Sequence, residues 1–591
     1  MEKKKINRGS LFKLIQLMLP YRGPFLLCLL LTVIVNAAEI FKPYVMKIII
    51  DDFLRDGAQQ HGLYSVNGMG VLYFLFIAAG ALAAMGHTRL ISRISQRILH
   101  DIRCRVFTHI SHMSLTAFDR YSSGRLLTRA TNDTDAINEF YADVIVNLFK
   151  DVMLVIGIST MMLVMNWKLA LVGFAVVPVI AVLSFSMKRI LKNNFKRMKQ
   201  IIGRINGFFS ENIDGMHTVQ AFNREEEKFR EFDGLNRAYF KTAILQIRMH
   251  SLLRPLMEVI NNLAIALLLV YGCGGVAAHT LEVGVVYAFT TYIKKFFEPI
   301  NDLADKYNTI QSAAVSAERI FEILDDTDAL EPLETNERRG GMSGKIEFDH
   351  VTFSYDGVHD VLHDVSFVIR PGEKVAFIGP TGAGKTTIIN LISGFYTPQH
   401  GEIRIDDVPV PQWNLGELRE HICVVLQEVF LFSGTIADNI ALSYDMTDDE
   451  IEQAVEQSAA TGFIARQPDG LQTQTAERGA TFSAGERQLL SFARAIARHP
   501  AILVLDEATA NIDSNTEQTI QQSIAQISRD RTTVFIAHRL STIRQCDCIY
   551  VIQDGRVAEQ GNHEQLMRLG GIYAEWSGRR FASESAESVN A

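Results

Sequence analysis

The first half of the chain alternates long apolar runs with polar segments. Six runs approach the roughly 20 residues that a helix needs to cross a bilayer. They cover residues 25–50, 70–91, 143–165, 169–187, 257–278 and 283–300, and an amphipathic piece at 11–19 suits a helix on the cytosolic membrane face. Two connections, 93–138 and 188–254, are long, helical in pattern and rich in Lys and Arg. The positive-inside rule therefore places these connections and both termini in the cytosol.

After residue 300 the last run continues with helical spacing to about residue 321, and a polar segment then marks a boundary. The remainder has the short alternating apolar segments of an α/β domain. At 591 residues the chain exceeds one ordinary core, so at least two domains are expected. A net charge of −8 over this length says little about partners, but the sequence has no basic aromatic surface of the kind that binds nucleic acid, so no nucleic-acid partner is expected. The six cysteines lack metal-ligand spacing.

A glycine-rich turn follows the apolar run at 374–378 and opens a helical segment at 387–392. Strand, turn and helix in this order are typical of a P-loop, in which backbone N–H groups and a helix N-terminus surround phosphate. We expect Lys385 to reach the β- and γ-phosphates and Thr386 to bind Mg²⁺. The predicted nucleotide-binding residues here are Gly379, Pro380, Thr381, Gly382, Ala383, Gly384, Lys385, Thr386 and Thr387.

A second apolar run, 501–505, ends in the carboxylates of Asp506 and Glu507. Such a strand is the expected partner of a P-loop. Asp506 would hold Mg²⁺ through water, and Glu507 would polarise the attacking water. A soluble P-loop kinase or GTPase would share the P-loop but lack the six apolar runs, which excludes that class.

Further motifs occur around these two. Phe482-Ser483-Ala484-Gly485-Glu486 is a small-residue turn that opens a helix, and Tyr355, Gln427 and His538 lie in short motifs of their own. Together they resemble the nucleotide-binding domain of ABC transporters, and the six runs resemble the membrane half of an ABC exporter. The resemblance implies that Tyr355 stacks on adenine, that Gln427 senses Mg²⁺ and the γ-phosphate, and that His538 contacts the γ-phosphate. It also places Asp513 at a dimer interface and identifies 114–129 and 212–222 as coupling segments.

One motif departs from the family pattern. The usual signature is Leu-Ser-Gly-Gly-Gln, and its Ser, glycines and helix N-terminus complete the ATP pocket of the opposite subunit. Ser483, Gly485 and Glu486 occupy the binding positions here, but Ala484 adds a Cβ and Glu486 a negative charge close to the phosphates. Because Glu507 is retained, the resemblance favours a heterodimer of two half-transporters with one strong and one degenerate ATPase site. A homodimer that tolerates the variant signature is the alternative.

Several polar residues fall within the apolar runs. Tyr287, Thr291, Lys294 and Glu298 share one face of the sixth run, and the first and fifth runs add Asn36, Glu39, Lys42, Glu258, Asn261 and Asn262. They indicate either a wet cavity for amphipathic or cationic compounds or a structural role. The structural role would be pairing, with Lys294 and Glu298 neutralising each other one turn apart, or snorkelling of residues near the ends of the runs. The sequence leaves both interpretations open, along with the substrate.

The predicted fold is a membrane α-helical domain with six transmembrane helices plus an α/β P-loop ATPase domain. The predicted boundaries are a transmembrane domain at 1–324, a linker at 325–343, the nucleotide-binding domain at 344–580 and a disordered tail at 581–591. The predicted function is ATP- and Mg²⁺-dependent export of hydrophobic or amphipathic compounds, drug-like molecules or lipids, across the cytoplasmic (inner) membrane. The remaining alternatives are a homodimeric flippase and a non-transporting ATP-gated membrane regulator.

Overall fold

The computed structural model of the chain describes residues 8–55, 65–327, 336–442, 445–506, 514–536 and 540–578. The chain divides into two compact units. One comprises residues 1–111 with 123–327, and the other comprises residues 112–122 with 328–591. The short segment 112–122 therefore belongs by its contacts to the second unit, although the sequence places it within the transmembrane domain. The predicted disordered tail, 581–591, and residues 328–335 of the predicted linker lie outside the described residues.

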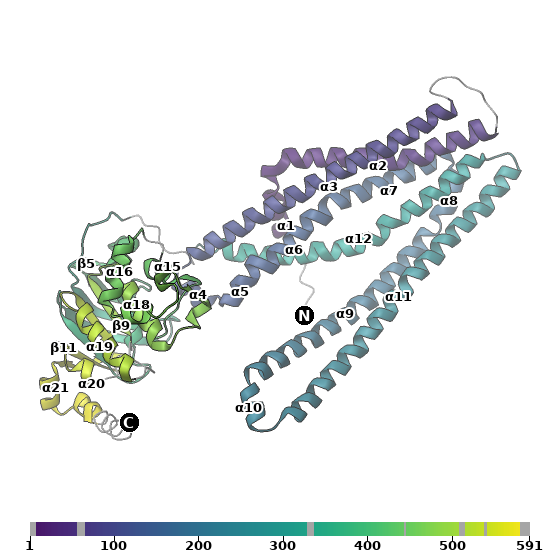
Figure 1. Ribbon diagram of the computed structural model, residues 1–591. Coiled ribbons are helices and arrows are strands. Elements are labelled where there is room, and N and C mark those ends of the chain that lie inside the picture. Colours follow the sequence, from purple (N-terminus) through teal and green to yellow (C-terminus); the bar gives the residue numbers. More distant parts are fainter. Residues whose placement is uncertain are drawn as a thin grey trace. The chain divides into compact units, whose positions relative to one another are not determined.

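Long helices make up the first unit (Figure 1). A 3₁₀ turn, η1 (Leu19–Tyr21), and π-helical turns, η2 (Ile49–Arg55), η4 (Arg129–Asp133) and η5 (Phe140–Ile145), connect several of them. The helices are α1 (Arg8–Leu17), α2 (Arg22–Ile48), α3 (Val66–Ser111), α5 (Ser123–Thr128), α6 (Thr134–Glu139), α7 (Val146–Met165), α8 (Trp167–Phe174), α9 (Val177–Asp214), α10 (Met216–Ala221), α11 (Glu225–Ala277) and α12 (Val283–Leu324).

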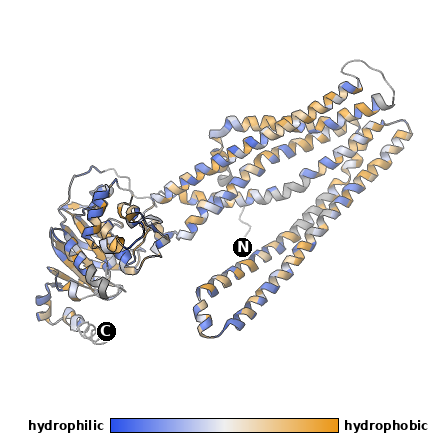
Figure 2. Ribbon diagram, in the orientation of Figure 1, coloured by the Kyte–Doolittle hydropathy of each residue, from blue (hydrophilic) through white to orange (hydrophobic). Residues whose placement is uncertain are grey.

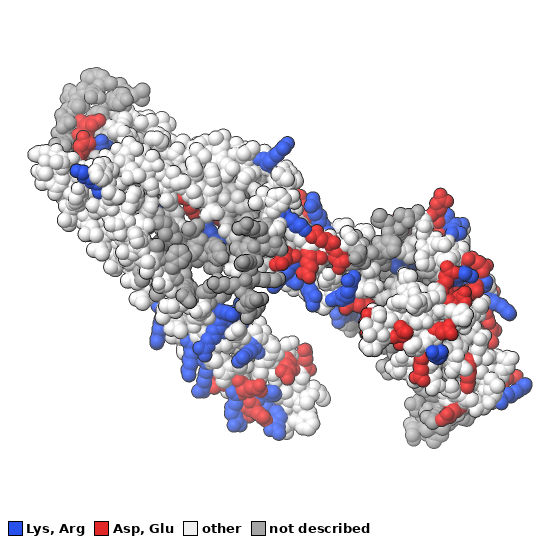
Figure 3. All heavy atoms as spheres, turned by 180° about the vertical axis from the view of Figure 1, so that it is seen from behind, with Lys and Arg blue, Asp and Glu red and all other residues white. Residues whose placement is uncertain are grey.

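The longest helices exceed the thickness of a membrane. With 46 and 53 residues, α3 and α11 are about 70 and 80 Å long at 1.5 Å per residue, whereas the apolar core of a bilayer measures about 30 Å. Each therefore combines a membrane-crossing part with a polar extension. Figure 2 shows hydrophilic residues gathered where α9 and α11 meet at α10. Figure 3 shows that a broad part of this unit's surface is almost free of charged side chains, which lie mainly toward its ends.

Four helical segments in the described part of the chain are long and apolar enough to cross a membrane: 12–52, 66–111, 123–165 and 258–277. The predicted fourth span is divided, because α8 ends at Phe174 and α9 begins at Val177, with Pro178 in its first turn. The predicted sixth span forms the first part of α12. It is less apolar than the others because it contains Lys294, Lys295 and Glu298.

Two main sheets form the second unit. A six-stranded sheet has the order β12-β11-β3-β10-β9-β6, and only β12 is antiparallel to its neighbour. A four-stranded antiparallel sheet has the order β2-β1-β4-β5. The strands are β1 (Ile346–Ser354), β2 (Asp360–Ile369), β3 (Lys374–Ile378), β4 (His400–Ile405), β5 (Val408–Pro409), β6 (Ile422–Val425), β7 (Gly434–Thr435), β8 (Gln474–Thr475), β9 (Ile502–Asp506), β10 (Thr532–Ile536), β11 (Cys548–Gln553) and β12 (Arg556–Gly561).

The central strands read as continuous apolar runs because both of their faces are covered. Every residue of β10 and the first four of β9 are buried. Two hydrophobic clusters share the six-stranded sheet, one containing α13 and the β1–β2 strands and the other containing α16 and α18. The helices of this unit are α4 (Leu115–Arg120), α13 (Lys385–Ile392), α14 (Leu415–His421), α15 (Ile436–Ala441), α16 (Asp448–Gln457), α17 (Thr461–Ile464), α18 (Ala484–Ala497), α19 (Ser514–Ile527), α20 (Leu540–Ile543) and α21 (His563–Leu569).

Candidate nucleotide-binding and coupling sites

The glycine-rich turn connects β3 to α13, as its sequence predicts. Two of its glycines are sterically required. Gly379 has φ +152°, and a Cβ there would lie 2.1 Å from the Ile552 carbonyl oxygen. Gly384 has φ +103°, and its Cβ would meet Leu362 at 2.6 Å. Any other residue at either position would displace the loop from the sheet that supports it.

The outer side of this loop is open. A Cβ added at Gly382 would meet no atom within 4 Å, and the side chain of Thr386 is exposed at the start of α13. Lys385 is buried, and its ammonium group donates to the carbonyl oxygens of Gly379 and Pro380, each at 2.9 Å. The ammonium group is thus held against the loop backbone. Loop N–H groups, a helix N-terminus and a lysine at one place are the donor set that a polyphosphate needs.

Strand register brings the predicted catalytic segments to the same edge of the sheet. Phe377 of β3 pairs with Ile536 of β10, and Ile536 pairs in turn with Asp506 at the end of β9. The neighbouring strand β6 ends at Val425, two residues before the exposed Gln427. Parallel strands that end together place the residues at their carboxyl ends close to one another. Asp506 and the P-loop therefore flank the end of β10.

Three predicted residues, Glu507, Asp513 and His538, lie outside the described residues. Glu507 follows Asp506 directly, and His538 follows the end of β10 by two residues. Their roles, like those of the other nucleotide-binding residues, remain predictions.

Tyr355 lies at the end of β1, in contact with the P-loop helix. Its hydroxyl donates to Thr387 Oγ1 at 3.2 Å and accepts from Asn390 Nδ2 at 3.3 Å. Tyr355 is 42% exposed, which is compatible with stacking on a flat ligand. Its other contacts are edge-to-face with Phe353 and Tyr396, with centroid separations of 4.8 and 5.1 Å.

Tyr396 joins this aromatic cluster to the first predicted coupling segment. Its hydroxyl donates to Asp119 Oδ2 of α4 at 2.8 Å. Burial and the neighbouring carboxylate of Asp119 raise the pKa of Tyr396, so the hydroxyl stays a donor at physiological pH. Ser114 caps α4 by accepting from Ala117 N. Sequence analysis missed Tyr396 because its partner is 277 residues away.

The signature turn caps its own helix. Ser483 Oγ accepts from Glu486 N at 3.3 Å, and Glu486 Oε2 accepts from Ser483 N at 2.9 Å, which forms a capping box at the start of α18. Ser483 and Ala484 are exposed, whereas Gly485 is buried. A carboxylate therefore occupies the positive end of the helix that the family resemblance assigns to phosphate.

The helix behind this turn is tied to the segment that follows Gln427. Arg494 of α18 donates to the carbonyl oxygens of Asn439 at 2.8 Å and Phe430 at 3.1 Å. Asn439 is itself buried and bonds to Phe432 on both backbone groups. These bonds hold the signature helix and the segment after Gln427 together.

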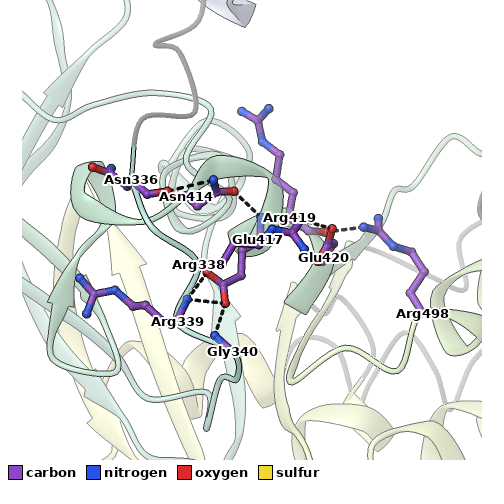
Figure 4. Close-up of polar contacts among 9 residues, drawn as sticks. All are labelled: Asn336, Arg338, Arg339, Gly340, Asn414, Glu417, Arg419, Glu420 and Arg498. Atoms are coloured by element: carbon purple, nitrogen blue, oxygen red, sulfur yellow. Dashed lines mark hydrogen bonds and ion pairs between the residues drawn. The ribbon is translucent and has the colours of Figure 1, made fainter.

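A buried carboxylate attaches the start of the second unit to α14 (Figure 4). Glu417 is 3% exposed and accepts from the backbone N–H groups of Arg339, at 2.9 and 2.8 Å, and of Gly340, at 2.7 Å. Burial opposes ionisation, but these N–H groups outweigh it and lower the pKa of Glu417. Asn414 caps α14 and also donates to Asn336 O at 3.2 Å. Sequence analysis did not identify this anchor.

The polar residues of the membrane helices are paired differently from the sequence-based interpretation. Lys42 and Lys295 both contact Glu39, whereas Lys294 and Glu298 form no ion pair with each other among the described side chains. Of the interpretations that the sequence leaves open, mutual neutralisation of Lys294 and Glu298 is therefore not found among the described side chains. Residue 295, one position further along α12, is the one that faces α2.

Apolar helices of membrane-crossing length and a P-loop α/β domain in one chain define a membrane protein that uses a nucleotide. The family description "ABC transporter transmembrane region" matches residues 25–300, and "ABC transporter" matches residues 362–510. Both lie in a single chain, in the same order as the two predicted domains.

Relatives share this organisation. A probable multidrug resistance ABC transporter ATP-binding/permease protein, YheH of Bacillus subtilis, is 38% identical over 86% of this chain and 76% of the relative. A fatty acid ABC transporter ATP-binding/permease protein of Mycobacterium bovis is 35% identical over 84% and 79%. The solved structure of a bacterial Atm1-family ABC exporter with ATP bound has a TM-score of 0.77 and 28% identity, with 95% of this chain and 98% of that chain covered.

The chain belongs to the ABC transporter family, as an exporter with its membrane and ATPase domains fused. The predicted family and fold class are confirmed, and so is an ATPase domain that drives transport. The protein is a multi-pass membrane protein that binds ATP. The comparisons leave the degenerate site, the heterodimer and the individual site residues as predictions.

Proposed function

We propose that this chain is the glutamate-bearing half of a heterodimeric exporter in the cytoplasmic membrane. Its P-loop would form the strong ATPase site with the partner's signature. Its own signature would serve a second site that binds ATP and turns over slowly. The observation that carries the proposal is the capping box in which the Glu486 carboxylate closes the N-terminus of α18.

The physical argument concerns charge. A helix N-terminus attracts a phosphate through its free N–H groups and its partial positive charge. Here the Ser483 N–H already donates to Glu486 Oε2 at 2.9 Å, and that carboxylate carries the same sign of charge as the phosphate. Exposed Ala484 adds a methyl group on the surface that would meet nucleotide. Both features weaken the attraction between this chain's signature turn and the ATP bound by the partner's P-loop.

The P-loop side shows no such defect. The glycines at the two restricted positions are present, Lys385 is held within the loop, and Thr386 is exposed. A hydroxyl and the nearby Asp506 carboxylate are hard oxygen ligands suited to Mg²⁺, which when bound would neutralise charge that develops on the phosphates. Lys385 would exchange its carbonyl acceptors for phosphate oxygens, and Glu507 would orient the attacking water.

An exposed apolar tip supports a requirement for a second half. Ile213, Met216 and Phe222, around α10 in the second predicted coupling segment, are 66%, 40% and 72% exposed. This tip is surrounded by charged residues, so a bilayer is a poor environment for it. Apolar side chains grouped at a polar end favour a protein partner, and we assign this tip to the partner's nucleotide-binding domain.

The transported compounds are proposed to be hydrophobic or amphipathic. The relatives carry names that refer to multidrug resistance and to fatty acids. The helices of the first unit supply the membrane environment from which such compounds would be taken. The cytosolic ATPase domain implies export from the cytosol or the inner leaflet.

The test is steady-state ATP hydrolysis by the detergent-solubilised chain, alone and co-expressed with the half-transporter encoded beside it. We expect activity only in the pair and its loss in Glu507→Gln. Glu452→Gln, which alters an exposed glutamate on α16, is the matched control and should retain activity. Full activity of the chain alone would refute the heterodimer. Hydrolysis without ATP-dependent accumulation of any amphiphile in inverted vesicles would favour the gated regulator instead.

A further inference from the structure

Two lysines, one from each of two membrane helices, meet at one carboxylate. Glu39 lies in the second half of α2, and Lys42 of the same helix donates to its Oε1 at 2.6 Å. Lys295 of α12 contacts the other oxygen, Oε2. Close by, the hydroxyl of Tyr292 donates to the Ile40 carbonyl oxygen at 2.7 Å, which fixes α12 against α2. We call Glu39, Lys42 and Lys295 the charge triad.

The charges within the triad do not cancel. Two ammonium groups share one carboxylate, so its formal charge is +1. Charged groups at membrane depth are costly unless they are paired, hydrated or in contact with a ligand. An ion pair in the same unit is charge-neutral by comparison. In it, one lysine, Lys306, contacts one carboxylate, Asp151, and each side chain is only 15% exposed.

The triad is also more accessible than that pair. The side chains of Lys42, Lys295 and Glu39 are 20%, 26% and 33% exposed. Among the described side chains, no second carboxylate contacts Lys42 or Lys295. The nearby exposed residues Lys294 and Glu298 contribute one charge of each sign.

One turn before Glu39, the helix adds polarity without adding negative charge. Asn36 is buried, and its Nδ2 donates to the backbone carbonyl oxygen of Lys150 at 2.8 Å, while its Oδ1 has no hydrogen-bond partner. The Lys150 side chain forms no ion pair with any described residue.

We propose that the charge triad is a subsite for the anionic headgroup of an amphiphile, a phosphate or carboxylate on an apolar chain. The inference rests on the proposed export function and specifies its substrate class. A headgroup of charge −1 would neutralise the triad and accept hydrogen bonds from both ammonium groups. A cationic compound would be repelled, so the proposal keeps the amphipathic compounds of the sequence-based interpretation and sets aside the cationic ones.

The experiment measures equilibrium binding without nucleotide, so it depends neither on hydrolysis nor on which site is degenerate. The full chain, in the complex in which it purifies, is placed in phosphatidylcholine nanodiscs. The radiolabelled probes are dodecyl phosphate, dodecylamine, dodecanol and inorganic phosphate. We expect saturable binding of dodecyl phosphate at least about tenfold tighter than of the other three.

Variants assign this binding to the triad. Lys295→Gln should lower the affinity for dodecyl phosphate by about tenfold, and Lys295→Arg should retain most of that affinity. The double variant Asp151→Asn/Lys306→Gln removes a balanced pair and is the matched control, with no change expected. Glu39→Gln removes the competing carboxylate and should bind dodecyl phosphate as tightly as the native chain or more tightly.

Several results would overturn the proposal. These are equal affinity of Lys295→Gln and the native chain, a preference for dodecylamine, equally tight binding of inorganic phosphate, or no saturable binding at all. If Lys295→Gln does not fold, the binding of dodecyl phosphate to Glu39→Gln becomes the test. If the triad served only to hold the helices together, that variant would bind dodecyl phosphate more weakly than the native chain. Failure of the proposed heterodimer would appear in the hydrolysis assay and leave these binding constants unchanged.

Discussion

Removing a single hydroxyl tests whether the nucleotide site and the first coupling segment communicate through Tyr396. Tyr396→Phe deletes the 2.8 Å hydrogen bond to Asp119 but keeps the ring that contacts Tyr355 at 5.1 Å. A hydrogen bond to a charged group contributes about 1.5–3 kcal/mol, and less where solvent competes. Because Asp119 is exposed, we take about 1 kcal/mol, equivalent to about fivefold weaker docking of α4.

The assay is ATP hydrolysis with and without the amphiphile that most stimulates the native protein. Tyr396→Phe should reduce the stimulation up to about fivefold and leave KM for ATP within about twofold. Tyr396→Ala also removes the ring and should raise KM for ATP. Because burial and Asp119 raise the pKa of Tyr396 above its ordinary value, the bond is fully present below that value, and the effect should be constant between about pH 6 and 9.

A double-mutant cycle with Asp119→Asn decides whether the bond itself is responsible. The two changes should be non-additive by about 1 kcal/mol. Tyr239→Phe, in the α9–α11 hairpin, is the control for loss of a tyrosine hydroxyl, because that hydroxyl bonds to no described residue. Additive effects, or a raised KM with normal stimulation in Tyr396→Phe, would refute a coupling role.

Two further changes test the signature and the anchor. Glu486→Gln removes the negative charge at the start of α18 and should increase the affinity of the second site for ATP about threefold, equivalent to about 0.6 kcal/mol. The measurement is a titration of nucleotide binding in a pair that also carries Glu507→Gln. Unchanged affinity would show that the carboxylate is not what weakens that site. Glu417→Gln should lower the free energy of unfolding of the nucleotide-binding domain at pH 7 by about 1–3 kcal/mol, which a thermal melt would detect as a lower melting temperature. Since the folded-state pKa of Glu417 is lowered, its contribution is present above the unfolded value and is lost as pH falls through the folded one, so native and variant melting temperatures should converge in acid.

Local features of the site were predictable from the sequence, whereas long-range partners were not. The P-loop lies in consecutive residues whose strand, turn and helix have local signals, and the structure places β3 at 374–378 and α13 at 385–392. The bond between Tyr396 and Asp119 spans 277 residues, and the contact between Lys295 and Glu39 spans 256. No periodicity within one helix indicates either contact. Helical spacing suggested Lys294 and Glu298 as partners. In the structure, α12 is oriented so that Lys295 faces α2 and contacts Glu39.

The P-loop and the signature turn are supported by different parts of the nucleotide-binding domain. The P-loop helix packs into the cluster that contains Ile388, whereas the signature helix packs into the cluster that contains Leu489 and Phe482. Each motif thus has its own support on the shared sheet. The route from Tyr355 through Tyr396 to α4 belongs to the P-loop half, and Arg494 ties the signature half to the segment after Gln427. Changes at Glu486 and Tyr396 should therefore act additively on hydrolysis, because sites without shared partners rarely couple by more than about 0.5 kcal/mol. A larger coupling would mean that the two halves move as one body and that a degenerate signature also alters the site this chain is proposed to power.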